Sequence, residues 1–443
     1  MHATVVRIGL SGRKRLVMRT TILRRTGARL LPGLLPVAAG ILLLQGCLKD
    51  RITETYRIYT PVYTLKATVL AQINGNPAEA VSQAGQLYVK GNYIYLNDVN
   101  EGIHVYDNSD ASHPHQVAWL NIPGNKNIAI KGNILYADMY QDLLALDISD
   151  PHQAKVIGSL PGFFSSRNYG DPNMVLTSWN IHDTTFRVRP TDMYSIPGTQ
   201  MYTFYGAAVP AAFETLNAGS GGTGIGGSTA VMTLIGNDIF AIPEEHSLGV
   251  IDISDPTQPK KLYEGSAGYD LETIFPLQDK LLLGSKEGVY IYSIADPANP
   301  TRVTEFVHGT ACDPVIADAT NAYVTLHAGT SCGGSANELD VLDAKNLSYT
   351  PLVRSYPMTS PTGLCKDGSL LFVCDGTVVK VFDATDPANL QLLSSAQAGN
   401  PMDVIAYDHH LLVVSADGLY QFGYSDPSHL VQLSYLPVNP SKS

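Results

Sequence analysis

The sequence predicts an all-β protein: a seven-bladed β-propeller with a long insertion between two of its blades. Three observations predict this fold. One motif, a short apolar strand closed by Ser-Asp-Pro or a close variant, occurs seven times along the chain. Most successive copies lie about 40 residues apart. Each unit has room for four short strands, and a period of this length is typical of a propeller blade.

The clearest copy of the motif reads LGVIDISDPTQPKKL at residues 248–262. Apolar residues alternate or cluster through Leu248, Val250 and Ile251, as in a half-buried strand, and the run stops at Ser254-Asp255-Pro256. An Asp carboxylate accepts hydrogen bonds from N–H groups two residues on, and Pro presets φ, so we expect Asp-Pro to close the strand. A second strand is expected over residues 260–265. The other copies are VYDNSD at 105–110, LDISDP at 146–151, YSIADP at 292–297, VLDAKN at 341–346, VFDATDP at 381–387 and FGYSDP at 422–427.

The spacing of the turn aspartates sets the number of units and locates the insertion. The intervals are 40 residues from Asp110 to Asp150, 41 from Asp255 to Asp296, 90 from Asp296 to Asp386 and 40 from Asp386 to Asp426. The interval of 90 holds two units, with Asn346 in the place of the fifth Asp. From Asp150 to Asp255 there are 105 residues, one unit plus an insertion at 163–228. An eighth blade made from the insertion is the alternative. In the second unit we expect strands over 128–131, 134–138, 143–148 and 154–160.

Within the insertion, MVLTSWNI at 174–181 and TFRVRP at 185–190 are expected to pair as a hairpin. The Gly-rich run GSGGTGIGGS at 219–228 is expected to be a flexible linker. It does not match a phosphate-binding loop, because no GK[ST] follows it.

From residue 87 to residue 438 the chain resembles the LVIVD-repeat β-propeller proteins. The resemblance is carried by the blade motif and by the stretches LETIFPLQDKLLLGSKEGVYIY, HGTACDP, GTSCGG and LLFVCDG. Many proteins of this family resemble lipid-anchored exported bacterial proteins, and the resemblance implies a propeller fold but no defined activity. This chain departs from the pattern at Ser293 and Gly423, where other copies have Asp, and at the AKN turn of the fifth unit.

The amino-terminal residues 1–47 have the composition of a signal peptide. They hold eight Lys or Arg, no acid, and an apolar run from Leu30 to Leu44. A start at Met18 gives a basic region of ordinary length, so we expect translation to begin there. The run ends Leu44-Gln45-Gly46-Cys47, which resembles a lipobox, so Cys47 is the predicted site of lipidation. A transmembrane anchor is the alternative, but the run is short and Pro32 and Pro36 interrupt it.

These features predict a protein of the cell envelope, lipid-anchored to the outer membrane, with the cell surface as a further candidate location. Residues 48–61 are expected to be a tether, and 62–443 a single propeller domain with a first strand over 62–73. Without residues 1–47 the chain has 21 basic and 40 acidic residues, a net charge of −19. This excess of acid argues against nucleic acid as a partner. The expected partners are the membrane, through the anchor, and an unidentified extracytoplasmic protein or glycan.

Function is expected on one of the two faces of the propeller. Because strands alternate in direction, the first-second and third-fourth turns of each blade lie on one face, and the second-third loops and the crossings between blades on the other. The second face receives the insertion and the longest loop, at 327–338, and loops of variable length are where binding residues concentrate. The candidate ligand residues on it are Trp179, Glu244, Glu245, Glu287, Asp313 and His327. The alternatives are solvated turn residues for the acids and, for Trp179, a small core within the insertion.

No catalytic, metal-binding or cofactor-binding residue is predicted. Ser, His and Asp are too plentiful in loops to select a catalytic triad, and His246, His308 and His327 fall in different units without a short ligand spacing. We therefore expect a non-catalytic binding module. The alternative is an exported glycan hydrolase or lyase that uses Glu244, Glu245 and Asp313, which would need two carboxylates roughly 5 to 9.5 Å apart.

Four cysteines remain besides Cys47. Cys312 lies in a crossing and Cys332 in the second-third loop of the same blade, so both are expected on one face. In an oxidising compartment we expect them to form a disulfide that closes a loop of about 20 residues. Cys365 and Cys374 are out of register across their hairpin and are expected to be buried thiols.

Overall fold

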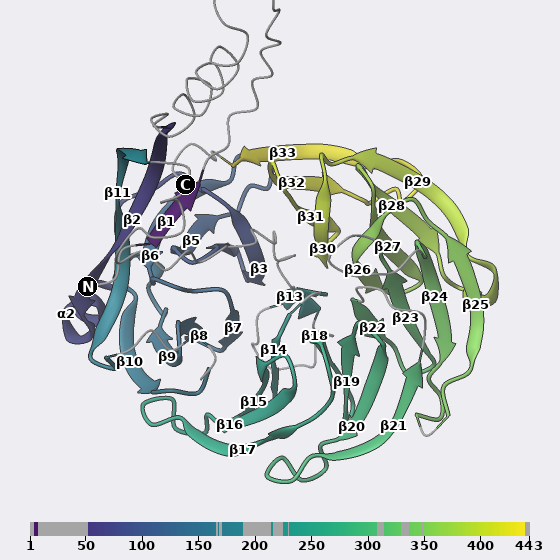
Figure 1. Cartoon of the computed structure of the whole chain (residues 1–443). Coiled ribbons are helices and arrows are strands. Elements are labelled where there is room, and N and C mark those ends of the chain that lie inside the picture. The colour runs from purple at the N-terminus through teal and green to yellow at the C-terminus, as the bar shows by residue number, and fades with distance from the viewer. Residues whose placement is uncertain are drawn as a thin grey trace, which may run out of the picture. The chain divides into compact units, whose positions relative to one another are not determined.

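Seven antiparallel sheets of the larger of two units form the blades of a β-propeller (Figure 1). The computed structural model describes residues 4–7, 52–164, 167, 171–188, 214–215, 225–228, 230–307, 314–328, 336–347 and 349–438. The larger unit comprises Thr64–Val175 and Ala207–Ser443, and the smaller one Met1–Tyr63 and Leu176–Gly206. Each blade is formed by four consecutive strands. The predicted fold and the count of seven blades are confirmed.

The strand boundaries follow the repeat. Blade 1 has β3 (Ala84–Lys90), β4 (Tyr93–Asp98), β5 (Gly102–Asp107) and β6 (His115–Asn121); blade 2 has β7 (Ile128–Lys131), β8 (Ile134–Met139), β9 (Asp142–Asp147) and β10 (Lys155–Leu160). Blade 3 has β14 (Met232–Ile235), β15 (Asp238–Glu244), β16 (Ser247–Asp252) and β17 (Lys260–Ser266); blade 4 has β18 (Leu271–Leu277), β19 (Lys280–Ser285), β20 (Gly288–Ser293) and β21 (Thr301–Val307). Blade 5 has β22 (Val315–Ala317), β23 (Asn321–Leu326), β24 (Glu338–Asp343) and β25 (Leu352–Pro357). Blade 6 has β26 (Pro361–Asp367), β27 (Leu370–Asp375), β28 (Val378–Asp383) and β29 (Gln391–Gln397); blade 7 has β30 (Pro401–Tyr407), β31 (His410–Ser415), β32 (Gly418–Gly423) and β33 (Val431–Pro437).

The aspartates of the repeat close the third strand of each blade as predicted. In blade 3, Asp252 Oδ1 accepts a hydrogen bond from Ser254 N at 2.8 Å, and Asp255 Oδ1 accepts one from Thr257 N at 2.9 Å. The same bond to the residue two positions on is made by the equivalent Asp pairs of blades 1, 2 and 6. In two copies a short 3₁₀ turn follows, at Pro151–Gln153 and Pro387–Asn389. The repeated Asp is therefore a turn device.

A register shift occurs between the third and fourth strands of every blade. In blade 3 it falls between Val250 and Ile251. Such a bulge adds local twist, which the outer strand of a propeller blade needs.

The hydrophobic core lies between neighbouring blades. Buried side chains of blades 1, 2 and 3 form one cluster, and those of blades 4, 5 and 6 another. The ring is closed between blades 7 and 1 by a cluster that includes Leu87, Leu96 and Val414. At the same junction Asn108 and Gln421 exchange two side-chain hydrogen bonds, of 3.0 and 2.8 Å, and Gln421 is fully buried. The ring is therefore closed by packing and side-chain bonds between two whole blades.

The smaller unit contains a three-stranded sheet in the order β1 (Thr4–Arg7), β2 (Ile52–Leu65), β11 (Met174–Val188). The predicted hairpin between residues 174–181 and 185–190 is wrong, because one continuous strand, β11, runs through both segments and pairs with β2. Residues 52–61, expected to be a tether, form most of β2.

The predicted strand over 62–73 is wrong from residue 66 onward. There, helix α2 (Lys66–Gln72) has the sequence KATVLAQ, which is rich in good helix formers. Its first residue, Lys66, forms an ion pair with the buried carboxylate of Asp142 in blade 2. Among the residues described, no helix is both long and apolar enough to cross a membrane.

Candidate functional site

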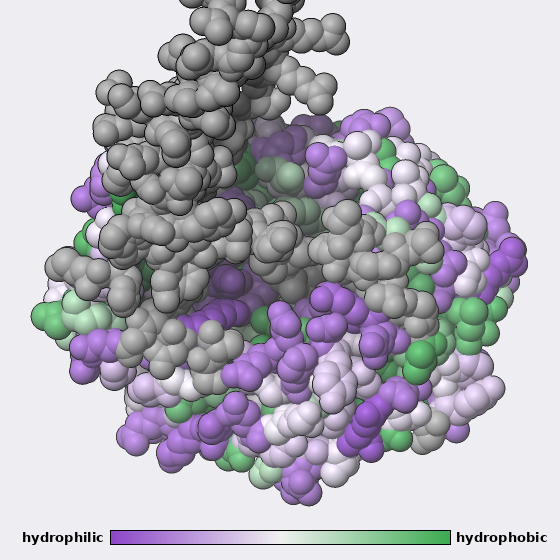
Figure 2. Space-filling view, in the orientation of Figure 1, coloured by the Kyte–Doolittle hydropathy of each residue, from purple (hydrophilic) through white to green (hydrophobic). Residues whose placement is uncertain are grey.

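The two faces of the propeller are built differently. On the turn face, which carries the first-second and third-fourth turns, side chains join neighbouring blades. Lys90 Nζ donates to Asn133 Oδ1 at 2.8 Å, and Lys131 Nζ donates to Asn237 Oδ1 at 2.6 Å. Each of these two lysines is thus bonded to an Asn of the neighbouring blade. The loop face carries the second-third loops and the crossings, and polar residues dominate the visible described surface (Figure 2).

On the loop face, three buried carboxylates hold the crossings that lead into their blades. They lie at or next to the end of the second strand: Asp98 in β4, Asp138 in β8 and Asp375 in β27. Each accepts hydrogen bonds from two successive backbone N–H groups of the crossing, at 2.7 to 2.8 Å. A carboxylate with this pattern fixes the loop in one conformation.

Asp98 and Asp375 are poorly suited to act as general acids. Burial favours the neutral form of Asp98, but hydrogen bonds from His104 and Ser82 outweigh it and lower the pKa of the carboxyl below its ordinary value. Burial also raises the pKa of Asp375, yet the bonds from Lys380 and the crossing lower it overall. Both groups are therefore held as carboxylates at neutral pH.

Asp138 lies at the centre of the densest polar network of blade 2. Its Oδ1 also accepts from Asn125 Nδ2 at 2.9 Å, and its Oδ2 accepts from Asn127 Nδ2 at 2.9 Å and from Arg167. The network continues into blade 1, because Asn97 Nδ2 donates to Asn125 Oδ1 at 2.7 Å. Buried polar groups are stable only when paired, so this network fixes the relative position of two blades.

A second buried chain of polar groups crosses blade 1. His104 is fully buried, with Nε2 3.2 Å from Asp98 Oδ2 and Nδ1 2.9 Å from Gln116 Nε2. A neutral ring protonated on Nε2 satisfies both contacts. The ring also lies against Trp119, with centroids 4.2 Å apart. The Asp–His pair is closed in by side chains and therefore orders the blade instead of activating a nucleophile.

The axis of the ring is occupied by the end of the insertion. Strand β13 (Ile225–Ser228) pairs with β3 of blade 1 and with the short strand β12 (Glu214–Thr215). It also lies against β26 of blade 6 and β30 of blade 7, and Figure 1 shows it at the centre of the ring. The predicted linker over 219–228 is therefore wrong for residues 225–228. The two glycines of IGGS pair with both neighbours, Gly226 with Tyr88 of β3 and Gly227 with Thr215 of β12.

Ser228 fixes β13 to Asp403 of blade 7. Its N–H and its hydroxyl both donate to Asp403 Oδ1, at 3.1 and 2.9 Å, and its Oγ accepts from Leu364 N at 2.9 Å. Asp403 is 1% exposed, and its Oδ2 has no hydrogen-bond partner among the described residues. Burial raises the pKa of Asp403 to about 7, although the bonds from Ser228 partly oppose this. There is no room for a side chain at Gly363, where a Cβ would lie 2.2 Å from Asp403 Oδ1.

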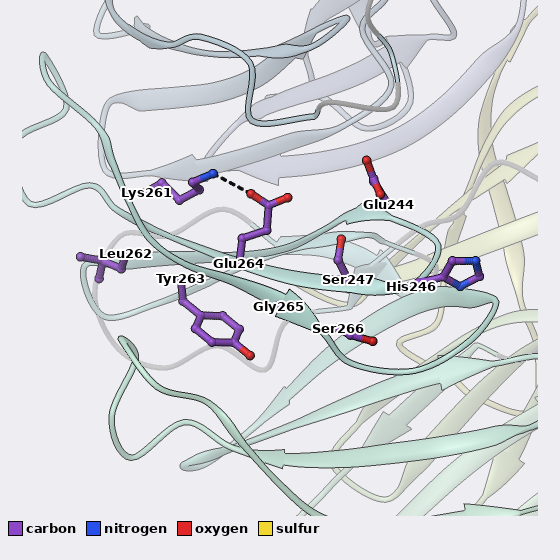
Figure 3. A pocket seen from close by; sticks show the side chains of 9 residues that line it. All are labelled: Glu244, His246, Ser247, Lys261, Leu262, Tyr263, Glu264, Gly265 and Ser266. Carbon is purple, nitrogen blue, oxygen red and sulfur yellow. Dashed lines mark hydrogen bonds and ion pairs between the residues drawn. The ribbon is translucent and has the colours of Figure 1, made fainter.

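An open groove of about 520 Å³ lies on blade 3 (Figure 3). Its lining comes from the β15–β16 turn and from β17: Glu244, His246, Ser247, Lys261, Leu262, Tyr263, Glu264, Gly265 and Ser266. Lys261 Nζ and Glu264 Oε2 are 2.7 Å apart within it, so these two charges neutralise each other. The groove offers hydroxyls, carboxylates and one tyrosine for contact with a ligand.

The structure places the predicted ligand residues on several elements. Glu244, Glu245 and Glu287 are exposed on the loop face, and Glu244 also lines the blade 3 groove. His327 is half-buried, and its Nδ1 lies 3.1 Å from Ser360 Oγ. Burial lowers the pKa of His327. Trp179 belongs to β11 of the smaller unit.

Several of the predicted residues lie outside the described residues. These are Asp313, Cys47, Cys312 and Cys332. The predicted disulfide between Cys312 and Cys332 therefore stays a prediction. The prediction for Cys365 and Cys374 is confirmed, because both are buried free thiols. In the part of the chain that the structure describes, no three His, Cys, Asp or Glu side chains lie close enough together to hold a metal ion.

Sequence reasoning did not single out Ser228, Asp138 or Arg167. Ser228 sits in a Gly-rich run whose local composition indicates a linker, and its partners lie 136 and 175 positions away. An Asp at or next to the end of an apolar second strand, present in blades 1, 2 and 6, is a signal that could have identified the crossing carboxylates.

These elements define the class of protein: a seven-bladed β-propeller made of a repeated four-stranded unit. LVIVD repeats are found in three stretches of the chain, which match the model of that family at residues 82–119, 124–160 and 238–262. These ranges cover blade 1, blade 2 and most of blade 3. The chain has no significant match among curated proteins.

Several solved structures share the fold. The periplasmic gluconolactonase of Pseudomonas aeruginosa is similar over 81% of this chain and 97% of its own, at 11% identity and a TM-score of 0.52. A protein from Lactobacillus plantarum is similar over 81% of this chain and 97% of its own, at 12% identity and a TM-score of 0.51. The computationally designed Ika8 protein covers 83% of this chain and 92% of its own, at 11% identity and a TM-score of 0.50. At these identities the likeness shows the fold alone.

Proposed function

We propose that this protein is an exported, lipid-anchored propeller that binds an extracytoplasmic protein or glycan through its loop face and catalyses no reaction. The observation that carries the proposal is that the buried acids of this face bond the backbone of the crossings or of β13. Asp98 and Asp375 are ionised and hold the crossings in place, and Asp403 is buried beneath Ser228 of β13. The crossings on this face are thereby fixed, and a rigid surface loses little conformational entropy on binding.

The competing function, a glycan hydrolase or lyase, needs two carboxyl groups with different protonation around one pocket. Among the described residues, the carboxyls with a raised pKa are Asp403 and Asp238. Asp238 owes its shift to burial and to Asp252, a turn-face residue, so the two groups belong to different blades and different faces. Glu244 and Glu245, the acids first considered for this role, are exposed.

Export and anchoring rest on the sequence of residues 1–47. The basic region, the apolar run and the Leu44-Gln45-Gly46-Cys47 ending support lipidation of Cys47 at the outer membrane, facing the periplasm or the cell surface. Cleavage before Cys47 would remove β1, so the mature sheet of the smaller unit would consist of β2 and β11. Diacylglycerol plus an amide-linked chain would give stable attachment.

A Cys47→Ala variant provides the protein for the test. We expect this substitution to abolish labelling by radioactive fatty acid and to release the protein from the membrane fraction. Incubated with a glycan and peptide array, the released protein should be retained on specific features without releasing product. Product release would establish the enzyme instead, and membrane retention equal to that of the wild type would place the anchor elsewhere.

Two matched triple variants test whether the ligand binds on the loop face. Glu244→Gln, Glu245→Gln and Glu287→Gln together remove three charges from the loop face without changing side-chain size. Asp150→Asn, Asp255→Asn and Asp426→Asn remove three from the turn face. Array retention should fall at least tenfold, which is about 1.4 kcal/mol, for the first set and stay unchanged for the second. The reverse ranking would contradict a loop-face site.

A further inference from the structure

One face of the β2–β11 ribbon carries exposed aromatic and aliphatic side chains. Two side-chain pairs show which residues share this face: Thr55 Oγ1 lies 3.2 Å from Thr185 Oγ1, and Arg57 Nε lies 3.0 Å from Asp183 Oδ1. Because side chains alternate along a strand, Tyr59 and Tyr63 follow on the same face of β2. We call this surface the aromatic face; its β11 residues are Thr185, Asp183, Ile181 and Trp179.

The aromatic face is exposed where the apolar side chains gather. The exposed fractions are 40% for Tyr63, 43% for Trp179 and 50% for Ile181. Trp179 contacts Tyr59 edge to face, with ring centroids 6.3 Å apart and an interplanar angle of 82°. On the opposite face, Tyr56 and Leu176 are each 6% exposed, whereas Val62 is 41% exposed. The aromatic face thus carries several exposed apolar side chains, an arrangement that marks an interaction surface.

The position of the predicted lipid indicates what covers this face. Only four residues, 48–51, separate Cys47 from the start of β2 at Ile52. Five fully extended residue steps span roughly 18 Å. A bilayer that holds the acyl chains of Cys47 therefore lies within that distance of Ile52, where the ribbon begins, so the ribbon can lie along the bilayer surface. Trp and Tyr side chains favour the interface between lipid headgroups and acyl chains, because they combine an apolar ring with a polar edge.

Two further observations favour the membrane over another partner. A two-stranded ribbon is marginally stable by itself. The mature sheet, which lacks β1, therefore gains stability when a surface covers its aromatic face. The mature chain carries a net charge of −19, so attraction to anionic headgroups cannot supply this contact. The contact has to come from apolar and aromatic side chains.

We propose that the aromatic face, with Trp179, Ile181, Tyr59 and Tyr63, lies in the membrane interface beside the lipid anchor. This inference rests on the lipidation of Cys47 in the proposed function. It adds a second point of attachment, which fixes the orientation of the β2–β11 ribbon at the bilayer.

The chain is well suited to a fluorescence test, because it has only one tryptophan besides Trp179. That residue, Trp119, is 9% exposed and lies against the ring of His104. Lipidated full-length protein is reconstituted into phosphatidylcholine vesicles whose acyl chains carry bromine, a contact quencher. We expect emission from Trp179 to shift to shorter wavelength and to be quenched relative to vesicles without bromine. A Trp179→Phe variant should show neither change, since only Trp119 remains.

A matched pair of variants separates the two faces. Ile181→Asp introduces a charge on the aromatic face and should abolish the quenching of Trp179, whereas Asn180→Asp introduces the same charge on the opposite face and should leave it intact. Unquenched Trp179 in vesicle-bound wild-type protein would overturn the proposal but would not contradict attachment through the lipid on Cys47. Protein that does not partition into vesicles at all would overturn the anchor as well. A spectral shift of Trp179 with a soluble glycan, in the absence of lipid, would assign the face to glycan binding instead.

Discussion

Replacing Asp138 by Ala is expected to lower the free energy of unfolding by about 3–5 kcal/mol, the cost of breaking a buried ion pair by removing one partner. The carboxylate is fully buried and accepts bonds from two backbone N–H groups, two Asn side chains and Arg167. Without it, these donors lose their acceptor, and the side-chain cation of Arg167 loses its counter-charge. Urea denaturation followed by circular dichroism measures the change.

Asp150→Ala is the matched control for this prediction. It removes the same residue type from the same blade, but Asp150 is exposed and only closes a turn. Its loss should cost no more than about 1 kcal/mol. Equal losses for the two variants would show that the network around Asp138 adds nothing to stability.

Asp403→Asn is expected to change how stability depends on pH. Burial raises the pKa of Asp403 to about 7 from an ordinary value of 3.8. Between these values the folded protein keeps a proton that the unfolded chain has lost, so the stability of the wild type falls as the pH rises. At about 1.4 kcal/mol per pKa unit, the contribution is on the order of 4 kcal/mol. Asn cannot ionise, so the variant should lack this loss and exceed the wild type in stability above pH 7.

The difference between variant and wild type isolates Asp403 from other groups. The two ionisable neighbours that share its surroundings, Cys365 and Cys374, are buried thiols whose pKa is raised, so they stay neutral throughout. Burial lowers the pKa of His327, which makes stability rise with pH near neutrality, and this contribution is the same in both proteins. Thermal unfolding at pH 4.5, 6 and 8 gives the comparison. Parallel pH profiles would contradict the burial of an ionisable Asp403.

The blades could be predicted because their signals are local. In blade 2 the expected and observed strands agree to within one residue at every end, since an apolar strand, an Asp-closed turn and a Gly-Asn hairpin lie within a few positions of each other. The Asp-Pro of the repeat is predicted to close the strand, and the hydrogen bond that Asp255 accepts from Thr257 N confirms this. The repeat of about 40 residues and the turns closed by Asp are therefore enough to predict the fold.

The insertion could not be predicted in the same way, because its structure depends on distant partners. The segments 174–181 and 185–190 are predicted to pair with each other, but β11 is continuous and pairs with β2, more than 100 positions earlier. The GIGGS segment has the composition of a linker, yet β13 forms where its glycines fit between the innermost strands. The buried network around Asp138 depends on blade packing, which local sequence does not encode.

Hydrogen–deuterium exchange of residues 225–228 tests the central claim most directly, namely that the chain fills the axis of its own propeller with β13. Paired and buried amides exchange slowly because they require local opening. The account predicts that this segment exchanges as slowly as β3, and that Ser228→Ala accelerates exchange in it and at Leu364, whose N–H donates to Ser228 Oγ. Exchange of residues 225–228 at the rate of an unstructured peptide, unchanged by Ser228→Ala, would contradict it.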